Sequence, residues 1–199
     1  MLGGHAWAGP NEDYQTGAKA YREGDLIGAM APLRRSADAG HAGAQALLGY
    51  ILDKAEFDEE AVAYFRKSAA QGHADGQYGL GAMYAAGEGV TKDAAEARRL
   101  ITLAADQGHQ LATNTLAQAY LSGNLGIGDA ERKSPEALAR LRKAVDLDYL
   151  PAIDALAAAY RSGDYGLTTD AKEAERLTAH ASKLRGVKKA ARGRSGQAK

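Results

Sequence analysis

Residues 74 to 109, ADGQYGLGAMYAAGEGVTKDAAEARRLITLAADQGH, contain the pattern that decides the fold. Leu80 and Tyr84 lie one helical turn apart on an apolar face, and Gly87 then offers the left-handed backbone that ends a helix. Asp93 follows as an N-cap for a second apolar face. The stretch therefore predicts two helices joined by a glycine-rich turn. Neither helix can bury its apolar face alone, so the pair needs neighbours of the same kind.

The rest of the chain supplies such neighbours. A Gly-His pair recurs at residues 40–41, 72–73 and 108–109. An aromatic or large apolar residue recurs near the end of each first helix, and the changes in spacing fall in the turn between the two helices, where a stack of repeats tolerates insertions. These residues are Tyr21, Leu52, Tyr84, Tyr120 and Tyr160.

The motif L-G-x-x-Y-x-x-G-x-G-V, then D-x-x-E-A, then A-A-x-Q-G-H, resembles the Sel1-like repeat, a relative of the tetratricopeptide repeat with a longer internal turn. The resemblance implies an all-α, right-handed α/α superhelix of about five helix-turn-helix repeats, used for protein–protein contact and without a reaction of its own. The expected repeats are about 11–41, 42–73, 74–109, 110–149 and 150–184. The matching residues are Leu80, Gly81, Tyr84, Gly87, Gly89, Val90, Asp93, Glu96, Ala97, Ala104, Ala105, Gln107, Gly108 and His109.

Residues 1–10 do not resemble a repeat. Ala6-Trp7-Ala8 has the small-x-small spacing that signal peptidase recognises, so we expect a signal-peptide remnant and a mature protein that begins near Gly9. On this interpretation the protein is periplasmic or secreted. The alternative is a disordered leader on a cytoplasmic protein. No other segment of the sequence has the run of about 18 apolar residues of a membrane span.

Residues 185–199 form a basic tail that we expect to be disordered, because Val187 is its one large apolar residue. The whole chain has 25 bases and 25 acids, but this tail has no acid. It could attract nucleic acid, anionic lipid or an acidic protein, or act only as a solubilising end. No aromatic residue alternates with its bases to stack on nucleotides. The bases are Arg185, Lys188, Lys189, Arg192, Arg194 and Lys199.

The sequence predicts no catalytic, cofactor or metal site. It has no cysteine, which excludes disulfides and thiolate chemistry. Equivalent positions of stacked hairpins lie on the order of 20 Å apart, so His41, His73 and His109 cannot share one ion and are expected to close the turns that they follow. Acid pairs such as Glu59-Glu60 stand at helix starts, where the helix dipole explains them. Glycine-rich turns lack the Gly-Lys-Ser/Thr ending of a phosphate loop.

Function is therefore expected on the concave side of the superhelix, which the first helix of each repeat lines. We predict a non-enzymatic adaptor that holds a partner protein or peptide in this groove, in the bacterial periplasm. The alternative is a cytoplasmic regulator whose basic tail binds nucleic acid or anionic membrane. Taken singly, each groove residue could equally be an ordinary solvated position. The predicted groove residues are Glu12, Gln15, Lys19, Arg22, Tyr50, Asp53, Lys54, Tyr78, Asn114, Gln118, Asp154 and Arg161.

Overall fold

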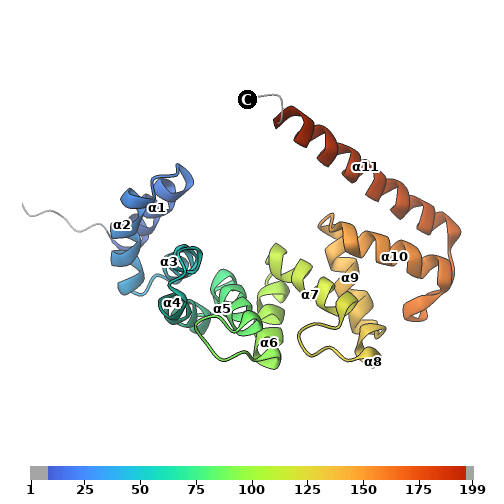
Figure 1. Ribbon diagram of the computed structural model, residues 1–199, viewed down its shortest axis with the longest axis horizontal. Helices are drawn as coiled ribbons and strands as arrows, with labels where there is room; N and C mark the ends of the chain where they lie inside the picture. Colours follow the sequence, from blue (N-terminus) through green and yellow to red (C-terminus); the bar gives the residue numbers. More distant parts are fainter. Residues whose placement is uncertain (1–8, 196–199) are drawn as a thin grey trace, which may run out of the picture. The chain divides into compact units, whose positions relative to one another are not determined.

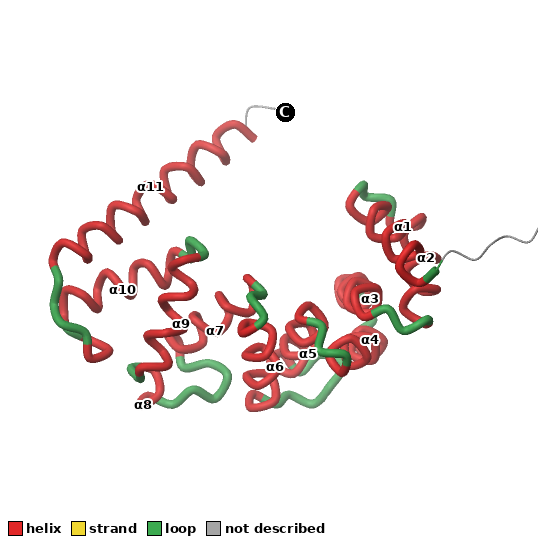
Figure 2. Tube along the Cα trace, turned by 180° about the vertical axis from the view of Figure 1, so that it is seen from behind, coloured by secondary structure: helices red, strands yellow, loops and turns green. Residues whose placement is uncertain are grey.

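The computed structural model of the chain describes residues 9–195, and the side chains of residues 9–187. This part contains helices and loops but no strand, which confirms the all-α prediction (Figure 1, Figure 2). The chain divides into two compact units, with the boundary between Ala112 and Thr113. The helices are α1 Pro10–Arg22, α2 Leu26–Asp38, α3 Ala42–Lys54, α4 Asp58–Ala70, α5 Ala74–Ala86, α6 Ala94–Asp106, α7 Gln110–Ser122, α8 Asp129–Arg132, α9 Pro135–Asp146, α10 Leu150–Ser162, the 3-10 turn η1 Asp164–Gly166 and α11 Ala171–Ser195.

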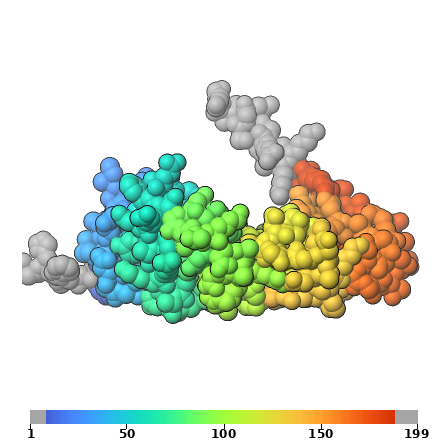
Figure 3. All heavy atoms as spheres, turned by 60° about the horizontal axis from the view of Figure 1, so that its bottom comes forward, coloured from blue at the N-terminus to red at the C-terminus, as the bar shows by residue number. Residues whose placement is uncertain are grey.

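The first unit is a stack of three helical hairpins. Helix α1 packs against α2, α3 against α4 and α5 against α6, while α2 contacts α3 and α4 contacts α5. The first helices also contact one another, α1 with α3 and α3 with α5. In Figure 3 the blue, cyan and green atoms of this unit follow one another in chain order. Each hairpin thus meets only its neighbours, as in a solenoid.

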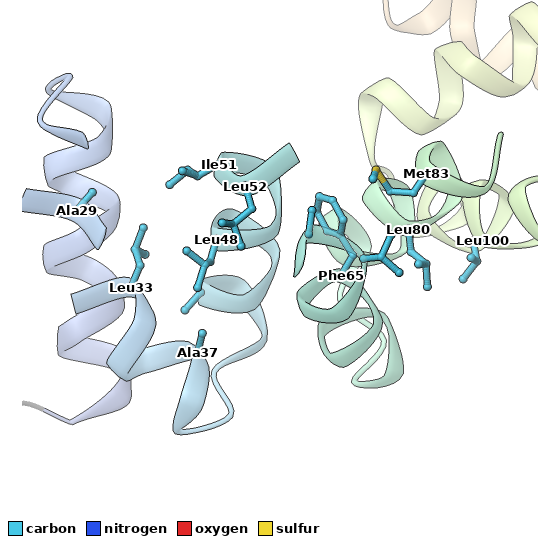
Figure 4. Close-up of a cluster of buried hydrophobic side chains, with 13 residues drawn as sticks. Ala29, Leu33, Ala37, Leu48, Ile51, Leu52, Phe65, Leu80, Met83 and Leu100 are labelled. Atoms are coloured by element: carbon cyan, nitrogen blue, oxygen red, sulfur yellow. The ribbon is translucent and has the colours of Figure 1, made fainter. Parts of the chain in front are cut away.

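The core of the first unit lies between successive hairpins. Figure 4 shows Leu33 of α2 pointing toward Leu48 of α3, and Phe65 of α4 lying beside Leu80 of α5. All four side chains are buried. Burying a leucine or phenylalanine contributes about 1.5–3 kcal/mol, so the contacts between hairpins add stabilisation that a single hairpin would lack. The prediction that each unit needs a neighbour to cover its apolar face is confirmed.

Glycines inside α5 allow the close packing of this core. A Cβ added to Gly79 would lie 2.3 Å from Cε1 of Phe65, and one added to Gly81 would lie 2.8 Å from Cγ1 of Ile101. Both distances are shorter than real Cβ contacts. The two glycines therefore lower the helix propensity of α5 but let α4 and α6 approach it closely.

Buried polar side chains hold the hairpins together at matching places. Nε2 of Gln71 donates to Oε1 of Gln45 at 2.8 Å, and Nε2 of Gln107 donates to Oε1 of Gln77 at 2.7 Å. In the first hairpin Arg35 and Asp13 take the place of the glutamine pair: Nε and Nη2 of Arg35 donate to the carboxylate at 3.1 and 2.6 Å. Gln45, Gln77 and Asp13 are buried, so these bonds satisfy groups that would otherwise be costly inside the stack.

Helix starts follow the sequence signals with one difference. Oδ1 of Asp93 accepts from the backbone amides of Ala95 and Glu96, both at 3.0 Å, so Asp93 is the N-cap of α6 as predicted. A capping box, in which Glu96 would accept from the amide of Asp93, does not form: that amide donates to the carbonyl of Tyr84 at 3.0 Å, and the carboxylate of Glu96 accepts from Arg99 at 2.8 and 2.7 Å. A charged partner one turn ahead competes better for this carboxylate than the backbone amide of the cap.

The second unit repeats the arrangement with a longer connection. Helix α9 begins at Pro135 with Ser134 as its N-cap, whose Oγ accepts from the amide of Ala137 at 3.1 Å. Helices α9 and α10 pack together, and α10 packs against α11. Their core is built from Leu138, Ile153, Leu156, Ala157, Leu177 and Ala181.

Two predicted boundaries differ from the structure. Helix α11 runs to Ser195, so the prediction that helix ends near Leu184 and that the tail is disordered is wrong for residues 185–195. A single glycine, Gly186, costs a helix only about 1 kcal/mol, while the lysines, arginines and alanines around it favour helix. At the other end, Pro10 already belongs to α1 and Gly9 is its N-cap, so the repeats begin before residue 11. Residues 1–8, with the expected cleavage motif, and residues 196–199 lie outside the described part.

Candidate binding groove

The first unit contains a groove of about 580 Å³ along its first helices. The side chains come from successive turns of α1, α3 and α5, with Phe65 of α4 and the start of α7 completing the lining. Tyr50 and Leu111 remain 44% and 58% exposed, which leaves apolar surface open to solvent. The lining residues are Tyr14, Ala18, Tyr21, Arg22, Gly43, Ala46, Leu47, Tyr50, Asp53, Lys54, Phe65, Asp75, Tyr78, Gly79, Ala82, Met83, His109 and Leu111.

Tyrosines form the walls of this groove, and neighbouring side chains hold their rings in place. The ring of Tyr14 stacks on that of His41 with centroids 4.4 Å apart, and Tyr78 stacks on His109 at 4.7 Å. Tyr21 and Tyr50 meet edge to face at 6.4 Å. Because each ring has a fixed neighbour, a ligand would meet walls that are already ordered.

The two histidines are held in turn by the helices that they precede. Nδ1 of His41 accepts from the amide of Ala44, and Nδ1 of His109 accepts from the amide of Ala112, both at 3.1 Å. The prediction that these histidines close their turns is confirmed for both. His73 makes no such side-chain bond, so there it is wrong.

In the neutral ring an accepting Nδ1 leaves the hydrogen on Nε2. Nε2 of His109 lies 3.0 Å from Oδ1 of Asp75 and can donate to it. His109 therefore links the beginnings of α5 and α7 while its ring face supports Tyr78. This arrangement places one end of the groove beside an acidic side chain that is already paired.

The opposite end carries cations. Nζ of Lys54 lies 2.9 Å from Oδ2 of Asp53 and 5.5 Å from the ring centre of Tyr50. The hydrogen bond with Asp53 raises the pKa of Lys54, so the amine stays charged. Burial and the neighbouring Tyr50 raise the pKa of Tyr21, which keeps its phenol neutral. Arg22 makes no ion pair with any other described residue.

Five of the predicted groove residues come together here: Arg22, Tyr50, Asp53, Lys54 and Tyr78. Their part in binding a partner stays a prediction, but the expected use of the first helices agrees with the lining.

Three other predicted residues of the first unit, Glu12, Gln15 and Lys19, do not line the groove. The cause is a register error in α1, where Tyr21 was matched to Leu52 and Tyr84. Counted from the first residue of each 13-residue helix, the position of Leu52 and Tyr84 is that of Ala20.

Shifting α1 by one residue brings Tyr14, Ala18 and Tyr21 into the groove, and the sequence interpretation missed all three as lining residues. Aligning the helices on their glycines would have given the correct register and these three residues. Gly17, Gly49 and Gly81 are each the eighth residue of α1, α3 and α5.

The remaining four predicted residues belong to the second unit, where they do not line the groove of the first unit and differ in their hydrogen-bond partners. Oε1 of Gln118 accepts from the hydroxyl of Tyr149 at 2.9 Å, and Nη2 of Arg161 donates to Oγ1 of Thr178 at 2.5 Å. Asp154 pairs with Arg185, and Oδ1 of Asn114 is buried without a hydrogen-bond partner within the described part. Arg185, the first base of the expected tail, is thus engaged by α10.

Among residues 9–187 no group of three or more histidine or acidic side chains is close enough to hold a metal ion. No helix of the described part has the length and apolar character needed to cross a membrane. What the first unit offers is an aromatic, partly charged groove built on a rigid stack of helical hairpins.

These features define a helical-repeat protein of the α-solenoid class. The family described as Sel1 repeat matches residues 58–73 and 74–109. Among solved structures, a protective antigen of uropathogenic Escherichia coli with an SLR fold superposes with a TM-score of 0.71 and 26% identity, over 88% of this chain and 38% of that chain. A Sel1 repeat protein of Oxalobacter formigenes superposes with a TM-score of 0.68 and 24% identity, over 88% of this chain and 73% of that chain. A search of curated proteins gives no match.

Residues 58–109 match the Sel1 repeat, as the motif from Leu80 to His109 predicts, and the helical stack of the chain resembles solved Sel1-like repeat folds. It spans less than half of the length of the E. coli antigen. Sel1 repeat proteins are generally non-catalytic scaffolds that bind protein partners.

Proposed function

We propose that this protein is a non-enzymatic adaptor that holds a segment of a partner protein in the groove of its first unit. The observation that carries the proposal is the groove of about 580 Å³, whose tyrosines are held by stacked neighbours while Tyr50 stays 44% exposed. Aromatic residues with one apolar face and one polar end are the side chains that most often anchor protein interfaces. Arg22 adds a charge with no partner among the described residues.

Site-specific photo-crosslinking tests the position of the partner. Ala82 of α5 is exposed and lines the groove, whereas Ala63 of α4 is also exposed and does not line it. A crosslinking amino acid placed at Ala82 in the living host should capture a defined partner, and one at Ala63 should not. Capture of the same protein from both positions would contradict the proposal.

Charge reversal gives an independent test with a matched control. Arg22→Glu changes an arginine that lines the groove, and Arg161→Glu changes one that contacts Thr178 in the second unit. We expect the first substitution to weaken capture and the second to leave it unchanged. If both variants captured the partner as well as the parent does, the groove would not be the binding site.

We also propose that the adaptor works in the bacterial periplasm. Support comes from Ala6-Trp7-Ala8 in the sequence alone. The rival proposal, a cytoplasmic regulator with a nucleic-acid-binding tail, has to accommodate the pairing of Arg185 with Asp154. Deleting residues 186–199 separates them: the adaptor keeps its partner, and the regulator loses salt-dependent binding.

A further inference from the structure

We propose that the groove of the first unit binds an extended, proline-rich segment flanked by carboxylates. The proposal rests on the proposed function and names the chemistry of the partner. It is carried by three features of the lining: the alternation of tyrosine and alanine, the pairing of the acidic groups, and the unpaired charge of Arg22.

Tyrosine and alanine alternate at equivalent positions of the helices that line the groove. At the fifth residue of α1, α3 and α5 the chain has Tyr14, Ala46 and Tyr78. At the ninth residue of the same helices the order is reversed, because Tyr50 of α3 stands between two alanines. A small residue thus occupies the equivalent position on the neighbouring helix of each tyrosine, and Gly79 also lines the groove.

A groove lined by aromatic rings with small residues beside them suits proline rings. A proline-rich segment forms a polyproline II helix before binding, so it loses little conformational entropy when it docks, and aromatic-lined grooves are a recurring way to recognise it. The stacks of Tyr14 on His41 and of Tyr78 on His109 make the walls equally ordered beforehand. Two ordered surfaces can bind without the entropic cost of folding either.

The hydrogen-bonding groups of the groove also fit such a ligand. Polyproline has carbonyl acceptors that no internal hydrogen bond satisfies, and proline has no N–H to donate. The two carboxylates that line the groove are taken by Lys54, at 2.9 Å from Asp53, and by His109, at 3.0 Å from Asp75. Arg22 remains as a donor toward the ligand.

Charge indicates what should flank the prolines. Arg22 is exposed at the end of α1 and has no ion-pair partner within the described residues, whereas Lys54 beside it is paired with Asp53. A carboxylate of the partner next to its prolines would supply that missing charge. Because the direction of the bound chain is open, the probe carries acidic residues at both ends.

The test uses the full chain and three fluorescein-labelled peptides in a polarisation assay. The first has eight prolines between pairs of glutamates, the second replaces the prolines by alternating glycine and serine, and the third replaces the glutamates by lysines. We expect the first peptide to bind about tenfold more tightly than the flexible one. It should bind about fivefold more tightly than the lysine one, as an exposed ion pair allows.

Variants connect this binding to the groove. Tyr50→Ala copies the alanine that α1 and α5 have at the same helical position, so we expect native circular dichroism and loss of proline-peptide binding. Tyr64→Ala, on the second helix α4 and outside the lining, is the matched control and should bind normally. Arg22→Glu should abolish the preference for glutamate over lysine.

Equal binding of all three peptides, or unchanged binding by Tyr50→Ala, would overturn the proline proposal. If the proline peptide fails while crosslinking at Ala82 still captures a partner that Arg22→Glu loses, the adaptor function stands and its ligand has another chemistry. If both experiments fail, the groove has no role in binding.

Discussion

Replacing Gly79 by alanine tests the packing that shapes both core and groove. The added Cβ would lie 2.3 Å from Cε1 of Phe65, where ordinary contact begins at 3.4 Å. The ring cannot move away easily, since a Cβ on Gly49 at its other side would already lie 2.9 Å from Cδ1. Alanine gains about 1 kcal/mol of helix propensity over glycine, but overpacking a close-packed core costs about 1–3 kcal/mol. We therefore expect Gly79→Ala to lower the free energy of unfolding by about 1 kcal/mol.

Urea denaturation followed by circular dichroism measures this change, with a lower midpoint and an unchanged slope. Replacing Phe65 by leucine removes the ring, so the double variant should lose less than the two single variants added together. Additive effects, or a Gly79→Ala protein at least as stable as the parent, would refute the account of the close contact.

The remaining predictions concern charge, the last helix and export. The Arg35 guanidinium lowers the pKa of Asp13 from its ordinary value of 3.8, so this carboxylate stabilises the fold above that pH and the stabilisation is lost as the pH falls through the lowered pKa. The urea midpoint of the parent should therefore exceed that of Asp13→Asn at neutral pH, and the difference should shrink at acidic pH. A Cβ on Gly186 would touch nothing within 4 Å, so Gly186→Ala should stabilise α11 locally by about 1 kcal/mol, measured by slower amide exchange around it. The mature protein isolated from its host should begin near Gly9 by N-terminal sequencing, and a retained Met1 would contradict export.

The sequence was sufficient for the fold because repeated local signals point to the same answer. Turn glycines such as Gly72 and Gly108, with φ of 78° and 85°, end one helix of each hairpin, and a cap such as Asp93 begins the next. Such signals act within one turn of the chain, so they can be read without knowing the tertiary structure. The hairpins and their order follow from them.

The site was harder to predict because it depends on register. Tyr21 resembles the tyrosine that recurs in later repeats, yet Ala20 occupies that place and Tyr21 lines the groove. An aromatic residue fits both the core position of a repeat motif and a position in the groove. Residue type alone therefore does not distinguish the two, and only the packing of the helices does. The stacks of Tyr14 on His41 and of Tyr78 on His109 are contacts between side chains far apart in sequence, which no local pattern contains.

The extension of α11 was missed for another reason. A segment rich in lysine and arginine buries little apolar surface, which favours disorder, but its helix propensity is high and α11 is already nucleated by its packing on α10. Continuing an existing helix requires no new nucleation, so residues 185–195 stay helical beyond the last core residues. Arg185 adds an ion pair with Asp154 at the start of this extension.

Equivalent helical positions carry different side chains in the two units. This difference distinguishes the positions that recognise a ligand from those that build the fold. Where α1, α3 and α5 offer tyrosine or alanine, α7 has Asn114 and Gln118, and α10 has Asp154 at its fifth residue. Tyr50, Tyr78 and Ala82 lie outside the buried core of the first unit, so these positions can change at little cost to the fold. A ligand selected by tyrosine walls should consequently lose its affinity when the first unit is altered and be indifferent to Asp154→Ala, because the second unit has no aromatic residue at the matching places.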